Sequence, residues 1–353
     1  MKKIITKIFK NKFPILVAEI SANHNGSIIR AKKLIKCAKE NGADAVKLQT
    51  YTPETMTVKS KKKYFKINNG LWKGYNLWDL YSKAQTPYEW HKELFNYAKK
   101  IGIVCFSTPY DESAVKLLEK LNCPIYKVAS FEMTDLPLIR KIAKTGKPII
   151  ISTGMASFKE IQQTFNYAKK NGAKEIVLLY CVSNYPAHKE DFNLNNIKIL
   201  KKRFKCTVGF SDHCNDQLVS CTAISVGAEI IEKHIALNGQ KKGFDIDFSL
   251  KGNEIKKFKN LITNTYNLLG KKRFFRKNSE KKSKQFRRSI FSIKNIEKGE
   301  KFNEKNIRRI RPGFGVAPVY YEKILKKKAP IKIDAGEPIS KKILKKLKIN
   351  LIN

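Results

Sequence analysis

The residues best suited to chemistry are two histidines that follow short apolar runs. His213 ends the segment Gly-Phe-Ser-Asp-His after Thr207–Val208, and His234 ends the segment Glu-Lys-His after the run Glu229–Ile231. If both runs are neighbouring strands of a barrel, the two imidazoles point into the same pocket. Two neutral imidazoles can bind a first-row divalent metal and leave room for a substrate oxygen. The alternative is that the two histidines are unrelated. The arrangement of strands and polar residues in the rest of the chain distinguishes these two interpretations.

Short β-rich runs alternate with amphipathic helical stretches, which is the pattern of a parallel sheet. Eight such units in about 250 residues favour an α/β fold of the (β/α)8 TIM barrel type. An open doubly wound sheet is the alternative, but no Gly-x-Gly-x-x-Gly motif follows any of the runs. The predicted strands are Ile15–Ile20, Ala45–Gln49, Ile103–Ser107, Ile125–Ala129, Pro148–Ser152, Ile176–Cys181, Thr207–Ser211 and Glu229–His234, and predicted helices include Ile28–Glu40, Glu89–Ile101, Ser113–Leu121 and Phe158–Asn171.

Polar residues stand at the downstream end of every predicted strand, where a barrel of this type places its reactive side chains. Lys47 and Lys127 lie inside the apolar segments Val-Lys-Leu and Tyr-Lys-Val. A lysine there must face a partner, because a buried unpaired charge is costly. Two lysines with a row of hydroxyls can hold a phosphate and a carboxylate. The strand-end residues are Glu19, Asn23, His24, Lys47, Gln49, Ser107, Thr108, Lys127, Ser130, Glu132, Ser152, Thr153, Ser183, Tyr185, Ser211, Asp212, His213, Glu232 and His234.

The chain has 353 residues and a formal net charge of +42. Such a charge can indicate a nucleic-acid or membrane-surface binder. However, the lysines recur in almost every predicted helix and do not form one stripe, so we interpret them as solvated helix faces. We therefore expect neither nucleic acid nor a membrane as a partner, and no apolar run reaches transmembrane length. The seven cysteines are scattered without a Cys-x-x-Cys motif, which favours the reducing cytoplasm.

Changes in composition divide the chain into two predicted domains. Residues 270–285 are charge-dense and almost without aliphatic side chains, which predicts a solvated linker; a nucleic-acid arm is the alternative. The linker would join a barrel over residues 1–269 to a domain over residues 286–353, which is near the lower size limit for independent stability. The basic opening segment, residues 1–14, lacks a long apolar run and a cleavage site, so we expect a leader into the first strand and no signal peptide.

The ordered motifs of the chain resemble the phosphoenolpyruvate-dependent sialic acid synthase family. The resemblance covers nearly the whole chain, and the tail from Phe286, with its Arg-Pro-Gly-x-Gly element at Arg311, resembles the antifreeze-like (SAF) domain of that family. It implies a barrel followed by a SAF domain, and condensation of phosphoenolpyruvate with an N-acyl amino sugar. The barrel motifs are Ala18–Ile20, Asn23–Gly26, Lys47–Thr50, Ser107–Pro109, Tyr126–Ser130, Ser152–Met155, Ser211–His213 and Glu232–His234.

The loop after the second predicted strand narrows the resemblance to one branch of the family. Its segments Gly70–Tyr81 and Thr86–His91 resemble pseudaminic acid synthases more than sialic or legionaminic acid synthases. That branch implies an open-chain 2,4-diacetamido-2,4,6-trideoxy-L-altrose as the acceptor sugar. The loop can also be a lid packed by its own aromatic residues. The nearest alternative is a sialic or legionaminic acid synthase; more distant ones are a barrel that makes a sugar-acid phosphate and a basic RNA-binding protein.

The resemblance also implies roles for individual residues. His213 and His234 would hold a divalent cation (Mn²⁺, Mg²⁺ or Co²⁺) that polarises the sugar aldehyde. Glu19 would act at the reacting centre or on the attacking water. Arg311 would reach the sugar in a neighbouring subunit's barrel, which implies a domain-swapped homodimer. The other implied contacts are Glu132, Tyr185 and Asp245 with the sugar, and Lys47, Thr108, Lys127, Ser130, Ser152, Ser183 and Ser211 with phosphoenolpyruvate.

Overall fold

The computed structural model describes residues 5, 8–9, 13–271 and 273–351 of the chain. Most of the opening segment, for which we expect a leader, lies outside the described residues, as does residue 272 of the predicted linker. The chain forms two compact units, Met1–Gly270 and Lys271–Asn353. Within the described residues, no helix has both the length and the apolar character needed to span a membrane.

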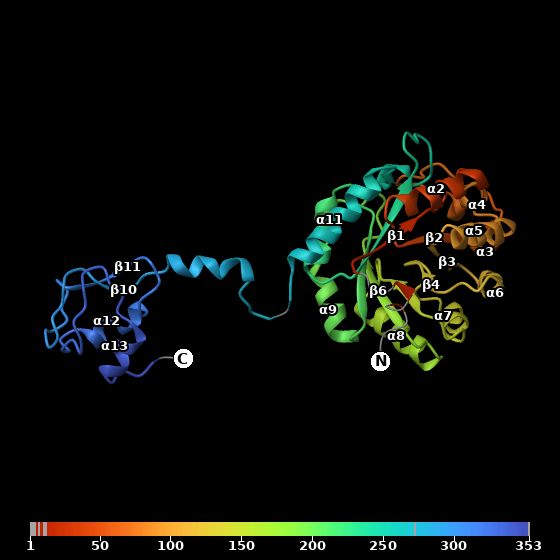
Figure 1. Ribbon diagram of the computed structural model, residues 1–353. Coiled ribbons are helices and arrows are strands. Elements are labelled where there is room, and N and C mark those ends of the chain that lie inside the picture. Colours follow the sequence, from red (N-terminus) through yellow and green to blue (C-terminus); the bar gives the residue numbers. More distant parts are fainter. Residues whose placement is uncertain (1–4, 6–7, 10–12, 272, 352–353) are drawn as a thin grey trace. The chain divides into compact units, whose positions relative to one another are not determined.

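Eight parallel strands close into a barrel in the first unit, which confirms the predicted fold class (Figure 1). The strands follow one another in chain order, and the barrel closes where β1 pairs with β8. Each predicted strand is present with ends within two residues of the expected ones. The strands are β1 (Ile15–Glu19), β2 (Ala45–Thr50), β3 (Val104–Pro109), β4 (Tyr126–Val128), β5 (Ile149–Ser152), β6 (Ile176–Cys181), β7 (Thr207–Asp212) and β8 (Ile230–Ala236), and a short β9 (Leu250–Lys251) pairs in parallel with the end of β8.

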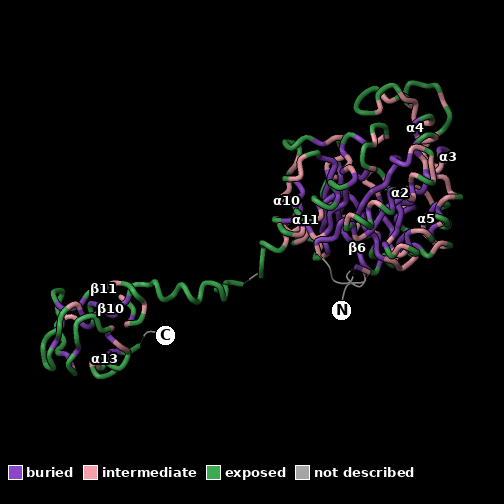
Figure 2. The backbone as a smooth tube through the Cα atoms, turned by 45° about the horizontal axis from the view of Figure 1, so that its top comes forward, coloured by how far each residue is buried: buried purple, intermediate pink, exposed green. Residues whose placement is uncertain are grey.

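Amphipathic helices surround the strands, and buried residues are concentrated on the strands (Figure 2). In α2 (Ile28–Glu40) the buried residues Ala31, Leu34, Ile35 and Ala38 recur at helical spacing, so one apolar face packs on the barrel. The Ser27 hydroxyl accepts a hydrogen bond from the Arg30 amide and caps this helix. The other covering helices are α5 (Tyr88–Lys100), α6 (Glu112–Lys120), α7 (Leu136–Ala143), α8 (Phe158–Lys170), α9 (Asn195–Phe204), α10 (Gln217–Ser225) and α11 (Glu254–Leu268).

A long connection between β2 and α5 forms the predicted lid. It contains α3 (Pro53–Met56), the short 3-10 helix η1 (Lys63–Phe65) and α4 (Leu77–Ala84), with an antiparallel bridge between Lys66 and Asn76. The Trp72 indole Nε1 donates a hydrogen bond to the Phe244 carbonyl oxygen at 3.0 Å. The ring of Tyr75 also meets that of Phe244 edge-on, with centroids 6.0 Å apart. These contacts hold the lid against the loop that follows β8.

The second unit has a hydrophobic core of its own. Its two antiparallel strands are β10 (Ser289–Ser292) and β11 (Ile307–Ile310), and its helices are η6 (Pro318–Tyr320), α12 (Tyr321–Ile324) and α13 (Lys341–Lys346). The segment for which we predict a linker carries two short 3-10 helices, η4 (Asn278–Glu280) and η5 (Lys282–Phe286), and its described residues are exposed. The core includes Ile290, Ile296, Phe302, Ile307, Ile324, Ile339 and Leu344.

Candidate active site

Strand register brings the predicted catalytic residues together. Glu19 at the end of β1 is paired with Lys47 on β2 and with His234 on β8. Register partners in a sheet project from the same face, and so do residues two apart on one strand. Glu232 therefore shares its face with His234, and both project toward the barrel interior. Lys233, which lies between them, projects to the other face, where its Nζ is 3.4 Å from an Asp212 carboxylate oxygen.

Four buried charged side chains, Glu19, Lys47, Lys127 and Glu232, form a cluster that we call the charged floor. The Glu232 Oε1 lies 3.5 Å from the Lys47 Nζ and 3.4 Å from the Lys127 Nζ. Glu19 forms an ion pair with Lys47. The most exposed members, Lys47 and Glu232, show only 4% of their surface to solvent. Each charge thus has an opposite partner, as burial requires.

The charged floor sets the protonation of its members. Burial acts to raise the pKa of Glu232, but the ammonium groups of Lys127 and Lys47 outweigh it and lower that pKa to about 2. Burial raises the pKa of Glu19 although the neighbouring Lys47 opposes it. Burial also lowers the pKa of Lys127. Glu232 is therefore a fixed anion that pairs with both lysines, and Glu19 is the carboxyl group better able to hold a proton.

Hydroxyl groups crowd around Gly154, just after β5. The Gly154 amide donates to the Ser130 Oγ at 3.1 Å. A Cβ at Gly154 would lie 2.1 Å from the Ser183 Oγ and 2.8 Å from the Ser130 Oγ, so only glycine leaves room for both hydroxyls. Ser152 lies directly before this turn, with its hydroxyl buried. Hydroxyl groups that lie near Lys47 and Lys127 can donate hydrogen bonds to the oxygens of a phosphate group.

The two histidines lie side by side, with ring centroids 5.7 Å apart. The His213 Nδ1 is 2.9 Å from the Val182 carbonyl oxygen and must donate to it, so the His213 Nε2 keeps its lone pair. Burial lowers the pKa of His213 to about 4, and burial with the neighbouring His213 lowers the pKa of His234. The His234 Nδ1 is 3.6 Å from an Asp245 carboxylate oxygen. Both imidazoles are therefore neutral near pH 7.

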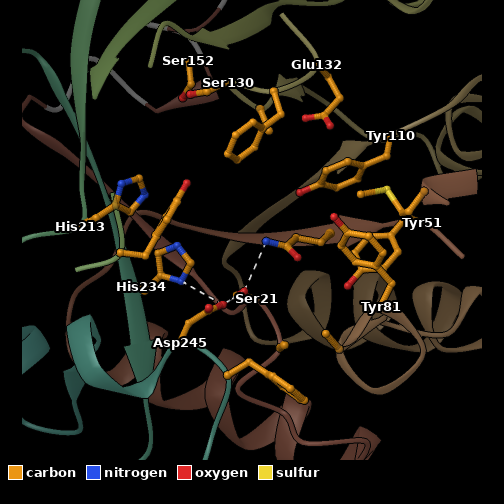
Figure 3. A pocket seen from close by; sticks show the side chains of 18 of the residues that line it. Ser21, Tyr51, Tyr81, Tyr110, Ser130, Glu132, Ser152, His213, His234 and Asp245 are labelled. Atoms are coloured by element: carbon orange, nitrogen blue, oxygen red, sulfur yellow. Dashed lines mark hydrogen bonds and ion pairs between the residues drawn. The ribbon is translucent and has the colours of Figure 1, made fainter. Parts of the chain in front are cut away.

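One pocket of about 350 Å³ joins these groups (Figure 3). The predicted site residues that do not line it are Glu19 and Thr108, which contact Lys47, Ser183, which stands beside Gly154, and Arg311, which belongs to the second unit. The predicted residues that line it are Lys47, Lys127, Ser130, Glu132, Ser152, Tyr185, Ser211, His213, His234 and Asp245.

Several residues that line the pocket have no role predicted from sequence. Glu232 is one of the predicted strand-end residues, and it lies two residues before His234 and so shares its face of the strand, but no function is predicted for it. Ser21, whose hydroxyl donates to Asp245, follows β1 in an irregular turn with a φ of 47° that carries no periodic signal. The other lining residues without a predicted role include Gln49, which is a predicted strand-end residue, and Tyr51, Trp72, Leu77, Leu80, Tyr81, Ala84 and Tyr110.

Buried polar atoms without a hydrogen-bond partner gather at the same place. Buried polar groups are nearly always hydrogen-bonded, so a group of exceptions indicates a ligand site. The described residues contain seven such atoms, and six of them belong to the strand-end cluster. These six are Glu19 Oε2, Glu132 Oε2, Ser152 Oγ, Ser183 Oγ, Glu232 Oε2 and His234 Nδ1, of which Glu19 Oε2 has the Lys47 ammonium as an ion-pair partner.

His24 and His91 are buried and do not line the pocket. The His24 Nδ1 accepts a hydrogen bond from the Gly26 amide, so its Nε2 donates to the Thr86 hydroxyl at 3.1 Å. The His91 Nδ1 donates to the Pro87 carbonyl, and its Nε2 accepts from the Thr50 hydroxyl at 2.8 Å. Burial lowers the pKa of both imidazoles, that of His24 to about 4. These histidines connect the start of α5 to the barrel as neutral hydrogen-bonding groups.

The barrel is expected to lose stability in mild acid partly through His24. Its pKa is about 4 when folded and near 6.5 when unfolded, so below pH 6.5 only the unfolded chain takes up the proton. The free energy of unfolding should fall by about 1.4 kcal/mol per pH unit through this window and level off below its lower end. Urea unfolding of wild type and His24→Gln at several pH values measures this slope. Parallel pH profiles for the two proteins would contradict the assignment.

Comparison with known protein families finds two matches along the chain. The model of the NeuB family matches residues 34–274, and that of the SAF domain matches residues 287–345. The first match spans most of the barrel with its pocket, and the second spans nearly all of the second unit's core.

Individual relatives match over almost their whole length. The pseudaminic acid synthase of Helicobacter pylori is 44% identical over 93% of this chain and 96% of its own. The N,N'-diacetyllegionaminic acid synthase of Campylobacter jejuni is 38% identical over 90% of this chain and 96% of its own. A solved structure of the N-acetylneuraminic acid (sialic acid) synthetase from Leptospira borgpetersenii, in complex with citrate, superposes with a TM-score of 0.70 at 28% identity, over 77% of this chain and 90% of that one.

Proposed function

This chain belongs to the NeuB family, and from that premise we propose that it is a pseudaminic acid synthase. It condenses phosphoenolpyruvate with open-chain 2,4-diacetamido-2,4,6-trideoxy-L-altrose. The enol carbon forms a bond to the sugar aldehyde, water adds to the resulting oxocarbenium carbon, and the carbon–oxygen bond to phosphate breaks. The products are the nine-carbon acid and phosphate. The observation that carries this reaction is that two lysines and two neutral imidazoles line one pocket under an aromatic lid.

The charged floor and the hydroxyls beside it bind phosphoenolpyruvate. Lys47 and Lys127 donate charged hydrogen bonds to the anion, and Glu232 holds the two ammonium groups at a fixed separation. Thr108 lies 3.3 Å from the Lys47 Nζ and positions that lysine. The hydroxyls that hydrogen-bond the anion are those of Ser130, Ser152, Ser183 and Ser211.

The residues present fit a divalent cation held by His213 and His234. Both are neutral, the His213 Nε2 lone pair is free, and Asp245 lies close enough to the second ring to orient it. No cluster of three or more His, Cys, Asp or Glu side chains in the described ranges could hold an ion, so the protein would supply two ligands and leave the others to substrate and water. A bound Mn²⁺, Mg²⁺ or Co²⁺ would supply Lewis-acid polarisation of the aldehyde.

The remaining predicted residues accept the proton of the attacking water and bind the sugar. Glu19, whose pKa burial raises, can accept a proton from the water that adds to the enol-derived carbon. Its Oε1 accepts a hydrogen bond from the Ser21 amide at 2.7 Å, which fixes the carboxyl group in the barrel. Glu132, Tyr185 and Asp245 line the pocket and contact the sugar. Burial raises the pKa of Glu132 to about 7, so this carboxyl group can serve as hydrogen-bond donor or acceptor.

A panel of acceptor sugars tests the proposed function. We expect phosphate release from phosphoenolpyruvate to require a divalent metal and to be fastest with the 2,4-diacetamido-L-altrose derivative. The comparison sugars are N-acetylmannosamine and the 2,4-diacetamido-2,4,6-trideoxy-mannose that leads to legionaminic acid. Faster turnover of either comparison sugar would reject the pseudaminic assignment and select the corresponding synthase.

We further propose that the enzyme is a domain-swapped homodimer in which Arg311 completes the partner's sugar site. Arg311 is exposed, and it stands in a cluster with Arg288, Arg308 and Arg309 on the second unit. Such a cluster suits a surface that meets acidic groups of another subunit.

The seven cysteines are free, which agrees with a cytoplasmic enzyme.

Subunit mixing should reveal this exchange. Arg311→Ala and Lys127→Met are each expected to be nearly inactive alone. After co-refolding, a mixed dimer would contain one intact site, made from the Arg311→Ala barrel and the other subunit's Arg311. Random assortment should then restore about a quarter of the wild-type activity. No gain over the separate variants would show that Arg311 does not act between subunits.

A further inference from the structure

The lid helix α4 presents an apolar face to the pocket. Leu77, Leu80, Tyr81 and Ala84 stand at helical spacing i, i+3, i+4 and i+7, and all four line the pocket. An apolar stripe with this period normally packs on a protein core. Here part of the surface that it faces is the space in which a substrate binds. Leu80 and Ala84 are buried, and Leu77 and Tyr81 are half-buried.

Two tyrosines from the barrel extend this face. The ring of Tyr51, just after β2, meets Tyr81 edge-on at 5.7 Å and Tyr110 at 5.2 Å between centroids. Figure 3 shows the three tyrosines on one side of the pocket, with His213, His234 and Asp245 on the other. We call the set Tyr51, Leu77, Leu80, Tyr81, Ala84 and Tyr110 the α4 wall. The reaction described above uses none of these residues.

We propose that the α4 wall receives the end of the sugar remote from its aldehyde, and selects a sugar that carries a terminal methyl group and a distal N-acetyl group. The inference rests on the proposed function, because that fixes the aldehyde carbon near the histidines and the charged floor. An extended six-carbon chain must then direct its far carbons to the opposite side of the pocket, where the α4 wall lies.

The chemistry of the α4 wall matches that end of a deoxy sugar. Leucine and alanine side chains can cover the C6 methyl but offer no partner to a hydroxyl, which would lose its hydrogen bonds to water there. The tyrosine rings can cover the methyl of an acetamido group, and their hydroxyls can donate to its carbonyl oxygen. Burial raises the pKa of Tyr51 and Tyr110, so these hydroxyls remain protonated donors. Fully hydroxylated hexosamines offer no such methyl groups at that end.

Changing the polarity of the α4 wall tests the inference. The readout is the ratio of kcat/KM for the 6-deoxy sugar to kcat/KM for its 6-hydroxy analogue, both with two acetamido groups. Wild type should favour the 6-deoxy sugar by about 10- to 100-fold. Ala84→Ser and Leu77→Gln each place a hydrogen-bonding group on the wall, and should reduce the ratio to about threefold or less. Asp79→Gln introduces the same side chain on an exposed position of α4 and should leave the ratio unchanged.

The outcomes separate this inference from the proposed function. If wild type does not turn over the 6-deoxy diacetamido sugar, both fail. If it does, and the two variants lower kcat/KM for both sugars by the same factor, the proposed function stands and the selective role of the α4 wall is wrong. Two separate positions keep the test informative if one variant does not fold, and the melting temperature of each protein identifies that case.

Discussion

Replacing Lys127 with methionine is expected to lower kcat/KM for phosphoenolpyruvate by about 10³-fold or more. The Lys127 Nζ is buried inside the barrel, 3.4 Å from Glu232, and faces the space where the anion must bind. Methionine keeps a similar length and removes the charge together with the N–H donors. Lys47→Met should behave in the same way, since Lys47 also pairs with Glu232. Phosphate release and calorimetric binding of phosphoenolpyruvate measure the loss.

A second substitution separates lost binding from lost stability. Removing Lys127 leaves Glu232 with one partner fewer, and breaking a buried pair in this way costs about 3–5 kcal/mol of stability. The double variant Lys127→Met/Glu232→Gln should recover much of that stability while turnover stays low. Lys259→Met is the control, because Lys259 pairs with Asp44 away from the pocket. Phosphoenolpyruvate affinity within threefold of wild type for Lys127→Met would contradict the role of the charged floor.

Replacing His213 or His234 with glutamine is expected to remove metal-supported turnover, with a loss of about 10³-fold. Each variant should also bind Mn²⁺ at least about 100-fold more weakly, because the proposed site gives the cation two protein ligands and each variant removes one of them. The electron paramagnetic resonance signal of free Mn²⁺ measures this binding without reference to activity. A chelator should abolish wild-type turnover, and added Mn²⁺ should restore it.

His188 supplies the control for the histidine variants. It is exposed on the loop after β6, so His188→Gln should keep both metal affinity and turnover. If His213→Gln and His234→Gln bind Mn²⁺ as tightly as His188→Gln does, the cation does not bind between these two rings.

The strands could be predicted because the sequence pattern that marks each of them spans only a few neighbouring residues. Each strand is a short apolar run, and the polar residue at its end marks the barrel rim, so eight strands and the convergence of Lys47, Lys127, His213 and His234 followed from spacing alone. The identity of the reaction needed the family resemblance. The spacing of these residues predicts that lysine and histidine side chains converge, but it does not identify the molecule that they bind.

The α4 wall could not be predicted for a physical reason. The connection that carries α4 lies between β2 and α5 and has no repeated spacing that fixes its path over the barrel. The apolar face of α4 looks in sequence like a face that packs on the core. Long-range contacts place this segment over the pocket, among them those of Trp72 and Tyr75 with Phe244, from a loop about 170 residues away, and that of Tyr81 with Tyr51.

A crystal structure of the enzyme with Mn²⁺ and phosphoenolpyruvate, with anomalous data collected at the manganese edge, tests the proposed reaction site most directly. We expect one manganese peak that contacts both His213 and His234, and phosphoenolpyruvate within hydrogen-bonding distance of Lys47 and Lys127 in the same pocket. Manganese elsewhere, or phosphoenolpyruvate bound without either lysine, would contradict the claim that these strand ends form one reaction site.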